Sequence, residues 1–405
     1  MPRKILHDLL SIEDARKLFE GIDVRTHVRP IEIERSTGRV LAEDIVSATA
    51  VPNFPKALKD GYAVRSEDVL SAIEKPVSLK LLGFSPVGQL PKYRVGEMEA
   101  VEVATGGPIP EGADAVVMVE DTELQEGNVL IKVAVSADEN LIHAGFDIHE
   151  DELVLRKGSR IWVREVGVLA AIGMRNVDVR SMKVGIISTG NELTVPGEPL
   201  GPGKIYDCNS YSLYASITDC GADAVPYGIV RDDREAFSGA VDRAIAECDL
   251  VLTSGSTSAG PDDFMFNIIE EKGKVLAHGL SFKPGKPVVA GIINEIPIVA
   301  LPGNPTSSLM VFYEFLLPLI RRCLGAPAPV RQVVPGVLEE DVNSGSRHEL
   351  HAVRLEGNKV FSASKTSASI TTLAAADGFI EIPAEVPMVS KGAGVEVVLF
   401  EDVCR

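Results

Sequence analysis

The stretch that decides the fold covers residues 224–258, AVPYGIVRDDREAFSGAVDRAIAECDLVLTSGSTS. An apolar segment over 224–230 is followed by Asp232-Asp233-Arg234-Glu235, which is typical of a helix start, and then by apolar residues at helical spacing. A second apolar segment, 250–252, leads into a glycine turn rich in hydroxyl groups, 253–258. A strand, a helix and another strand in this order indicate a parallel βαβ unit.

The same alternation of strands and helices extends on both sides of this stretch. Its segments are strands at 184–187, 288–290 and 298–300, helices at about 210–220 and 261–271, and turns at 188–193 (STGNEL) and 301–308 (LPGNPTSS). The pattern predicts a doubly wound, mostly parallel sheet with helices on both faces. The three turns then fall at the carboxyl ends of strands, where such sheets bind ligands.

The rest of the 405-residue chain is long enough for further domains. Residues 1–50 and 145–182 mix helical and strand patterns and are expected to form a discontinuous linker domain. Residues 51–144 carry β-branched segments broken by Gly and Pro, which predicts a β-rich insertion domain. The α/β domain is expected over 183–327. Residues 328–405 show five strand patterns and no helix pattern, which predicts a small β-barrel or sandwich.

Composition and charge argue against several classes of protein. With 58 acidic and 40 basic residues the net charge is −18, which disfavours binding to nucleic acid or to an anionic membrane. The longest apolar stretch, 309–320, contains Glu314 and Pro318 and is shorter than the ~20 residues of a membrane span. We expect it to be a buried helix. The N-terminus lacks the apolar core of a signal peptide, which favours a cytoplasmic location, and five scattered cysteines indicate neither disulfides nor a zinc site.

The glycine turns and one lysine-rich loop predict a site for anions. Hydroxyl groups and free backbone amides hold anions without net charge. The loop Lys283-Pro284-Gly285-Lys286-Pro287 adds two ammonium groups on a rigid frame, which suits a phosphate or a tetrahedral oxyanion. Asp263 follows the middle turn, and such a carboxylate can hold a divalent cation against a phosphate. Asp232 is suited to the same task, whereas Asp233 is equally well explained as a helix cap.

Five motifs, in order and at their spacings, resemble the MoeA family of molybdopterin molybdenumtransferases, which includes the E domain of gephyrin. The motifs are residues 60–64 (DGYAV), 105–117 (TGGPIPEGADAVV), 188–193, 283–287 and 301–305. The resemblance covers essentially the whole chain. It implies a four-domain subunit that forms a homodimer and takes adenylylated molybdopterin and molybdate as substrates. The implied reaction inserts the metal at the dithiolene sulfurs and releases AMP, with Mg²⁺ as the divalent cation.

The resemblance also implies roles for individual residues. A molybdate pocket is implied for Lys283, Lys286, Pro287, Ser307, Arg347 and Ser367. The pterin and its phosphate are expected along Gly190, Asp207, Asn209, Ser254, Gly255 and Ser258. Glu192, Asp232 and Asp263 are expected to bind Mg²⁺ or to orient the water that splits the phosphoanhydride, and Asp60 completes the catalytic set. Thr105 and Asp147, like Asp60, are expected to approach the site from other domains, those of the partner subunit.

The chain departs from the family pattern at two of the three turns. Asn191 stands where an aspartate is usual, which keeps an oxygen ligand but loses a charge, and Ser256 replaces the second glycine of an S-G-G turn. Two alternatives therefore stay open beside molybdate insertion. One is the same chemistry with tungstate, which has nearly the same size and charge. The other is a pterin-binding carrier or scaffold with weak turnover.

Overall fold

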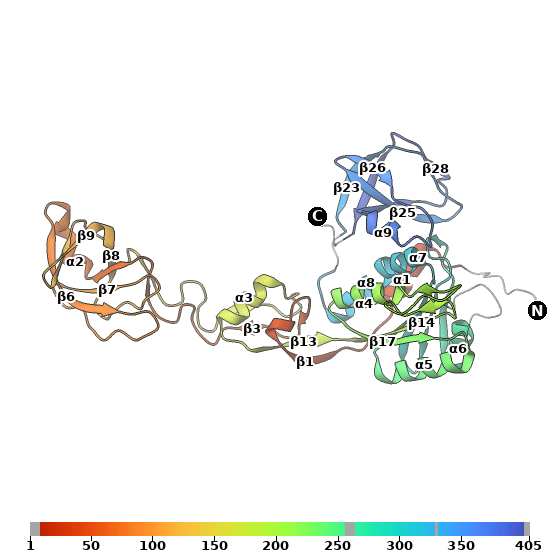
Figure 1. Cartoon of the computed structure of the whole chain (residues 1–405), viewed down its shortest axis with the longest axis horizontal. Coiled ribbons are helices and arrows are strands. Elements are labelled where there is room, and N and C mark those ends of the chain that lie inside the picture. Colours follow the sequence, from red (N-terminus) through yellow and green to blue (C-terminus); the bar gives the residue numbers. More distant parts are fainter. Residues whose placement is uncertain (1–8, 256–263, 329–330, 401–405) are drawn as a thin grey trace, which may run out of the picture. The chain divides into compact units, whose positions relative to one another are not determined.

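The computed structural model of the chain describes residues 9–255, 264–328 and 331–400 (Figure 1). The predictions for Ser256, Ser258 and Asp263 lie outside the described residues. The chain divides into two compact units. Unit 1 comprises Met1–Glu43, Lys157–Val163 and Asn176–Arg405, and unit 2 comprises Asp44–Arg156 and Arg164–Arg175. The division into four domains is finer than this one and stays a prediction.

A six-stranded sheet in the order β17-β14-β18-β22-β21-β19 forms the centre of unit 1. Its strands are β14 (Lys183–Thr189), β17 (Asp223–Val230), β18 (Leu250–Ser254), β19 (Lys274–His278), β21 (Val289–Ile293) and β22 (Ile296–Leu301). The first four strands in this order are parallel, and β21 is antiparallel to both of its neighbours. The expected mostly parallel sheet is thus confirmed, although the strand pattern of β19 was not recognised in the sequence.

Helices cover both faces of this sheet (Figure 1). They are α1 (Ile12–Glu20), α4 (Asn209–Asp219), α5 (Arg234–Glu247), α6 (Phe264–Lys272), α7 (Pro305–Val311) and α8 (Leu317–Leu324). Buried residues of α5 and α6 share a core with one face of the sheet, and those of α1, α4, α7 and α8 share a core with the other. Asp233 caps α5, because its carboxylate accepts a 2.8 Å hydrogen bond from the Ala236 amide. The capping explanation of Asp233 is therefore confirmed.

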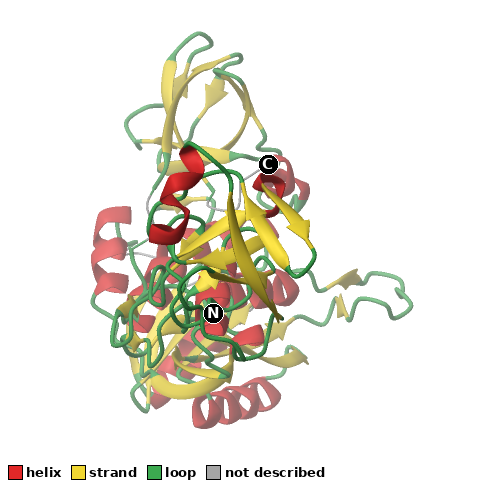
Figure 2. Ribbon diagram, turned by 90° about the vertical axis from the view of Figure 1, so that its left-hand side faces the viewer, coloured by secondary structure: helices red, strands yellow, loops and turns green. Residues whose placement is uncertain are grey.

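The C-terminal part of unit 1 is a closed five-stranded barrel in the order β25-β26-β23-β29-β27, with β27 pairing back to β25. Its strands are β23 (Val333–Leu338), β25 (His348–Glu356), β26 (Lys359–Ser362), β27 (Gly378–Ile382) and β29 (Gly394–Leu399), seen curving at the top of Figure 2. This confirms the predicted barrel. The expectation of no helix beyond residue 327 is wrong, because α9 (Thr371–Ala375) forms a short turn there. The pair β24 (Val342–Asn343) and β28 (Met388–Val389) was also missed.

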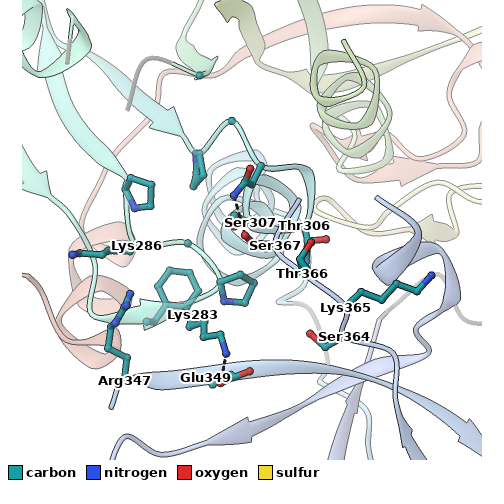
Figure 3. A pocket seen from close by; sticks show the side chains of 18 of the residues that line it. Lys283, Lys286, Thr306, Ser307, Arg347, Glu349, Ser364, Lys365, Thr366 and Ser367 are labelled. Atoms are coloured by element: carbon teal, nitrogen blue, oxygen red, sulfur yellow. Dashed lines mark hydrogen bonds and ion pairs between the residues drawn. The ribbon is translucent and has the colours of Figure 1, made fainter. Parts of the chain in front are cut away.

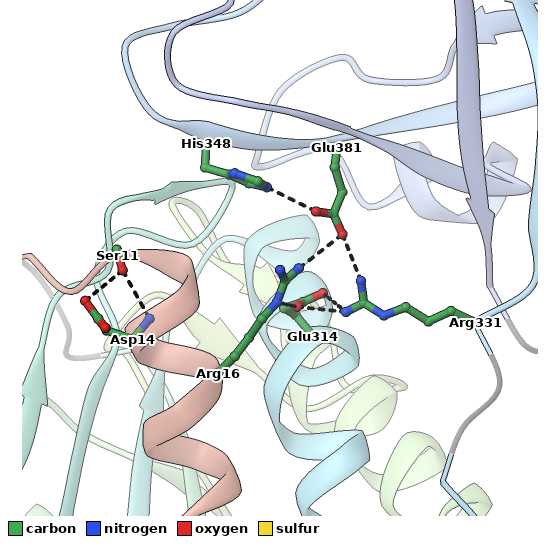
Figure 4. A network of polar contacts seen from close by, with 7 residues as sticks. All are labelled: Ser11, Asp14, Arg16, Glu314, Arg331, His348 and Glu381. Carbon is green, nitrogen blue, oxygen red and sulfur yellow. Dashed lines mark hydrogen bonds and ion pairs between the residues drawn. The ribbon is translucent and has the colours of Figure 1, made fainter.

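An ion cluster anchors the barrel to the helices of unit 1 (Figure 4). The buried carboxylate of Glu314 pairs with Arg16 of α1 at 2.6 Å and with Arg331 at 2.8 Å. Both arginines also reach Glu381 of the barrel, at 3.1 and 2.8 Å, and His348 lies 3.4 Å from it. The hydrogen bond from His348 and the two arginine charges outweigh burial and lower the pKa of Glu381 to about 2.

Glu314 occupies a π-helical turn, Phe312–Leu316, that connects α7 to α8. The apolar stretch 309–320 is accordingly a buried helix, as expected, and its acidic residue is paired inside the protein. None of the helices in the described part of the chain is long and apolar enough to cross a membrane.

The remaining elements of unit 1 are short. They are β1 (His27–Glu32), the 3₁₀ turn Ile33–Arg35, β2 (Val40–Leu41), β13 (Asn176–Ser181), β15 (Leu193–Thr194), β16 (Ile205–Tyr206) and β20 (Phe282–Lys283). The strands β1, β13 and β2 form one sheet, and β15 pairs with β16. Strand β20 pairs in parallel with β25. This two-residue strand from the α/β part of the chain therefore extends the sheet of the barrel.

Unit 2 is built mostly of strands around its own apolar core. Its main sheet has the order β8-β5-β7-β6-β10-β9. The elements are β3 (Ile45–Val46), β4 (Lys56–Ala57), β5 (Gly61–Val64), α2 (Ser66–Val69), a 3₁₀ turn Leu70–Ile73, β6 (Val77–Ser85), β7 (Glu99–Val103), β8 (Ala115–Met118), a 3₁₀ turn Val119–Asp121, β9 (Thr122–Gln125), β10 (Asn128–Ile131), β11 (Leu141–Ile142), β12 (Leu153–Leu155) and α3 (Val163–Ala171). The β-rich character expected for this region is observed.

Candidate functional site

A cleft of about 1070 Å³ opens in unit 1 between the carboxyl ends of the sheet strands and the barrel (Figure 3). Strands β14, β18 and β22 are neighbours in the sheet, so the turns that follow them meet at one edge. Residues from all three turns line the cleft, together with the lysine loop and two segments of the barrel. The predicted site residues found in its lining are Gly190, Glu192, Asp232, Gly255, Lys283, Lys286, Pro287, Ser307, Arg347 and Ser367.

Three of the predicted pterin-binding residues support the cleft from behind instead of lining it. The amide of Asn209 donates to the Ser254 hydroxyl at 2.7 Å and to the Gly303 carbonyl at 2.8 Å, which joins the second turn to the third. Asp207 accepts hydrogen bonds from the backbone amide and the hydroxyl of Ser210, at 3.1 and 2.7 Å, at the start of α4. These side chains hold the turns in place, and neither Asp207 nor Asn209 nor Ser254 belongs to the cleft lining.

Glycine is required where the second turn passes the first. Gly255 has φ +97°, and a Cβ there would meet the carbonyl oxygen of Thr189. Gly285, in the middle of the lysine loop, has φ +139°, and a Cβ there would meet the ring of Phe282. Both glycines let the backbone approach a neighbour closely, which keeps the turn and the loop at the cleft edge.

One end of the cleft is cationic and rich in hydroxyl groups. Lys286 and Arg347 line it, and neither forms an ion pair with any residue in the described part of the chain. Ser307 of α7 and Ser367 of the barrel line the same cleft, and Asn304 donates to the Ser367 hydroxyl at 2.9 Å. Two unneutralised cations with nearby hydroxyl groups suit a small, doubly charged oxyanion.

The first lysine of the loop is bound differently from the second. The ammonium of Lys283 lies 3.0 Å from the Glu349 carboxylate, which is 2% exposed. The same carboxylate accepts a hydrogen bond from His351 at 3.0 Å and one from the Ser344 hydroxyl at 3.2 Å. Burial raises the pKa of Glu349, but the bonds from His351 and Lys283 outweigh burial, so this pKa lies below its ordinary value. Glu349 is therefore ionised, and Lys283 carries a compensated charge.

The cleft lining also contains two carboxylates from the sheet turns, Glu192 and Asp232. The Asn191 amide donates to Asp232 at 3.0 Å, and the Asn191 side-chain oxygen accepts from the Asp232 amide at 3.3 Å. The asparagine thus joins the first turn to the end of β17 without adding a third charge. Within the described ranges no cluster of three or more His, Cys, Asp or Glu side chains could hold a metal. The third expected ligand, Asp263, lies outside those ranges.

The three expected contributors from other domains belong to unit 2. Thr105 donates to the Asp60 carboxylate through its backbone amide at 2.6 Å and through its hydroxyl at 3.0 Å. These bonds lower the pKa of Asp60. Asp147 is exposed, and its backbone amide donates to the Val51 carbonyl at 3.0 Å. Asp60 and Thr105 are thus brought together within unit 2.

Sequence reasoning missed several residues that line the cleft. They are Thr189, Phe264, Phe282, Pro284, Gly285, Pro302, Gly303, Asn304, Thr306, Asn343, Glu349, His351, Ser364, Lys365 and Thr366. Many of these lie within the glycine turns and the lysine loop, so the motifs contained a usable signal. The barrel residues had a weaker one: Arg347 and Ser367 were predicted only through the family resemblance, and their neighbours in 348–351, HELH, and 364–366, SKT, were not assigned to the site.

Comparison with known protein families covers most of the chain. Residues 10–173 match the MoeA N-terminal region (domains I and II), residues 185–322 match a probable molybdopterin binding domain, and residues 335–400 match the MoeA C-terminal region (domain IV).

Individual relatives agree with this assignment. The chain is 34% identical over 385 residues to molybdopterin molybdenumtransferase 2 of Mycobacterium tuberculosis, covering 91% of this chain and 95% of that protein. It is 33% identical over 320 residues to molybdopterin molybdenumtransferase of Haemophilus influenzae, with 78% of each chain covered. The crystal structure of a molybdopterin biosynthesis MoeA protein from Pyrococcus horikosii superposes with a TM-score of 0.82 at 36% identity, over 97% of this chain and 100% of that one. By sequence and by fold, the chain belongs to the MoeA family of molybdopterin molybdenumtransferases.

Proposed function

We propose that the chain inserts molybdate into adenylylated molybdopterin and releases AMP, and so completes a step of molybdenum cofactor biosynthesis. The single observation that carries this proposal is that one cleft combines two chemically different sets of groups. Its lining offers Lys286, Arg347 and hydroxyl groups together with glycine turns and two carboxylates. At about 1070 Å³, the cleft also has room for a nucleotide-sized ligand and an oxyanion together, since ordinary ligand pockets occupy roughly 300–1,000 Å³.

In this proposal the cationic end binds molybdate. Lys286 and Arg347 balance the two negative charges of the tetrahedral anion, and the hydroxyl groups of Ser307 and Ser367 donate to its oxygens. The turns at Gly190 and Gly255 line the part of the cleft where the pterin and its phosphate would bind. Both ligands then occupy one cleft, so the substrate sulfurs can reach the oxyanion.

The carboxylates of Glu192 and Asp232 fit a magnesium site of the kind that uses one or two protein carboxylates together with substrate phosphates. Such a pair beside a phosphoanhydride needs a cation, since the chain itself carries a net charge of −18. Bound Mg²⁺ would neutralise charge that develops on the departing phosphate. Glu192 and Asp232 would hold it, with Asp263 as the proposed third ligand.

We further propose that the active enzyme is a cytoplasmic homodimer. The support is the resemblance to the family, together with the fact that Asp60, Thr105 and Asp147 belong to unit 2 whereas the cleft-lining residues belong to unit 1. The hydrogen bonds from Thr105 keep Asp60 ionised, as a carboxylate must be to accept a proton or bind a cation. Equilibrium sedimentation of the purified chain tests the dimer directly, and a monomer at micromolar concentration would refute it.

The function is tested by incubating the protein with adenylylated molybdopterin and Mg²⁺, with molybdate, tungstate or neither, and measuring AMP. Release that depends on molybdate supports the proposal. AMP release that depends on tungstate alone would show that tungstate, and not molybdate, is the substrate. Tight pterin binding without AMP release, with molybdate or with tungstate, would contradict the enzymatic role and favour the pterin-binding carrier or scaffold.

A further inference from the structure

Behind Lys283, a chain of hydrogen bonds extends into the barrel. The Ser362 hydroxyl lies 2.8 Å from His351 Nε2, His351 Nδ1 lies 3.0 Å from one oxygen of Glu349, and the other oxygen lies 3.0 Å from the Lys283 ammonium. Figure 3 shows the last link, with Lys283 reaching down from its loop to Glu349. Of these four residues, Lys283, Glu349 and His351 line the cleft.

The ionisation of Glu349 fixes the direction of the bonds that its carboxylate makes. An ionised carboxylate only accepts, so His351 donates to it through Nδ1 and Lys283 donates to it through the ammonium. The carboxylate therefore has a fixed orientation and presents its second oxygen to Lys283. Lys283 in turn is anchored at its backbone, because β20 pairs with β25 and places Lys283 opposite Glu349.

The cations at this end of the cleft thus divide into two kinds. Lys286 and Arg347 form no ion pair with a described residue, so their charges are available to the oxyanion. The charge of Lys283 is balanced by Glu349, so it adds little net attraction. It still has N–H groups to donate, since an ammonium has three and Glu349 uses one. An ammonium that is held in place at the cleft but adds little net attraction can donate one of these N–H groups, and then its proton, to an oxygen of the bound anion.

The reaction assigned above requires such a group. Two Mo–S bonds form, one Mo–O bond breaks, and the oxygen leaves as water with the two protons that the dithiol sulfurs lose. Charge balances at −2 on each side, and molybdenum stays hexavalent, so no oxidant or reductant is needed. The departing oxygen is a poor leaving group until it is protonated, which makes a positioned acid valuable.

We propose that Lys283 is the general acid that protonates the departing oxygen, and that Glu349 and His351 are positioning residues that aim its ammonium. Lys283 gives its proton to the oxygen and recovers one from a substrate thiol. This inference rests on the proposed function. It adds that Lys286 and Arg347 bind the anion while Lys283 transfers a proton, although the family resemblance assigns all three to a single pocket.

Arginine substitution separates binding from proton transfer. In Lys283→Arg the positive charge and the pair with Glu349 remain, but a guanidinium does not release its proton at neutral pH. We expect the rate of molybdenum incorporation into the pterin to fall about 100-fold, within the range for general acid catalysis, while the KM for molybdate changes less than about threefold. Full activity in this variant would overturn the role of Lys283.

Glu349→Gln tests the positioning role, with Glu356→Gln at the exposed end of the same strand as the matched control. The charged or titratable groups that line the cleft with Lys283 are Glu349 and His351 on β25, Lys286 on its own loop, Arg347 and Lys365 of the barrel, and the carboxylates Glu192 and Asp232. With three cations remaining, loss of the Glu349 charge favours the neutral amine. We expect a roughly tenfold lower kcat and an alkaline limb of the pH profile displaced to lower pH, partial rescue in Glu349→Asp, and no effect of Glu356→Gln.

Two further outcomes keep the interpretation specific. An unchanged pH profile in Glu349→Gln, with Tm and molybdate KM also unchanged, would overturn the positioning role. Complete loss of activity in Ser362→Ala would also overturn it, because Ser362 would then be acting as a nucleophile activated by His351. The wild-type protein serves as the reference for both proposals. If it fails to release AMP, the proposed function fails, whereas if it turns over and Lys283→Arg matches it, only the general acid fails.

Discussion

Two clusters of buried charge join the barrel to the rest of unit 1, and they differ in the cations that they use. In the first cluster Glu314 and Glu381 are paired with Arg16 and Arg331, and His348 lies beside Glu381. In the second, Glu349 is paired with Lys283 and His351. Each cluster contains a histidine, so the contrast lies between arginine, which keeps its charge at any physiological pH, and lysine, which exchanges its proton when its surroundings favour it. We infer that the arginine cluster holds the barrel against the helices, whereas the lysine cluster has the catalytic role proposed above.

The exposure of the cations differs less between the clusters than their chemistry does. The side chain of Glu314 is 2% exposed, and its partners Arg16 and Arg331 are 29% and 45% exposed. Lys283 is 52% exposed beside a carboxylate that is 3% exposed, so its ammonium faces the open cleft. A shielded pair costs much when one partner is removed, because the other is left buried and unpaired, while an exposed cation can be solvated instead.

The largest expected effect is on stability, at the arginine cluster. Glu314→Ala leaves Arg16 and Arg331 without their shared buried carboxylate, and we expect a loss of about 3–5 kcal/mol in the free energy of unfolding. Urea denaturation followed by circular dichroism measures it. A loss below about 1 kcal/mol would show that Glu314 is no more important than a surface ion pair and would remove the contrast between the clusters.

Lowering the pH should destabilise the protein through Glu381 of the same cluster. The pKa of Glu381 is about 2 in the folded protein against an ordinary value of 4.5. Its contribution is therefore fully present above pH 4.5 and is lost as the pH falls towards 2, and the difference corresponds to about 3 kcal/mol. Tm measured from pH 6 to pH 2 should fall less steeply in Glu381→Gln than in wild type. Parallel curves would contradict this contribution.

At the cleft, the largest effect should be on oxyanion binding. Lys286→Ala removes one charge-assisted contact, worth about 2 kcal/mol or roughly 30-fold in affinity for molybdate. Affinity for the pterin should change less than about threefold. Calorimetric titrations with each ligand test this, and Lys359→Ala on the barrel surface, where the lysine pairs with Glu339, is the control. Equal losses for both ligands would place the oxyanion elsewhere.

The smallest effect is expected for stability at the lysine cluster. Glu349→Gln keeps the size of the side chain, and the half-exposed Lys283 can turn to water, so we expect a loss of about 1 kcal/mol or less. Urea denaturation beside Glu314→Ala gives a direct ranking. If the Glu349 variant were the less stable of the two, the cleft cluster would have to be regarded as structural.

Much of the fold could be predicted because its signals are local. Apolar segments, a helix-capping residue such as Asp233 and glycine turns each occupy a few consecutive residues, and the rules of βαβ topology bring the turns after β14, β18 and β22 to one edge. The lysine loop was recognisable for the same reason. These local signals sufficed to predict both the cleft residues of the turns and the cations of the loop.

The rest depended on pairings between distant parts of the chain. Strand β20 is two residues long, too short for a periodic pattern, and its partner Glu349 lies 66 positions after Lys283. Glu314 was recognised only as an interruption of an apolar stretch, since nothing nearby in the sequence reveals that Arg16 lies 298 positions away and pairs with it. A buried carboxylate is explained by its partners, and those partners are known only after folding.

The most direct test compares Glu349→Gln and Glu314→Gln in one assay, the rate of molybdenum incorporation into adenylylated molybdopterin at a temperature where both variants are folded. A proton-moving cluster at the cleft and a structural cluster behind it predict a rate at least tenfold below wild type for Glu349→Gln and within about twofold of wild type for Glu314→Gln. Equal rates in the two variants, or the reverse order, would contradict the division between the clusters.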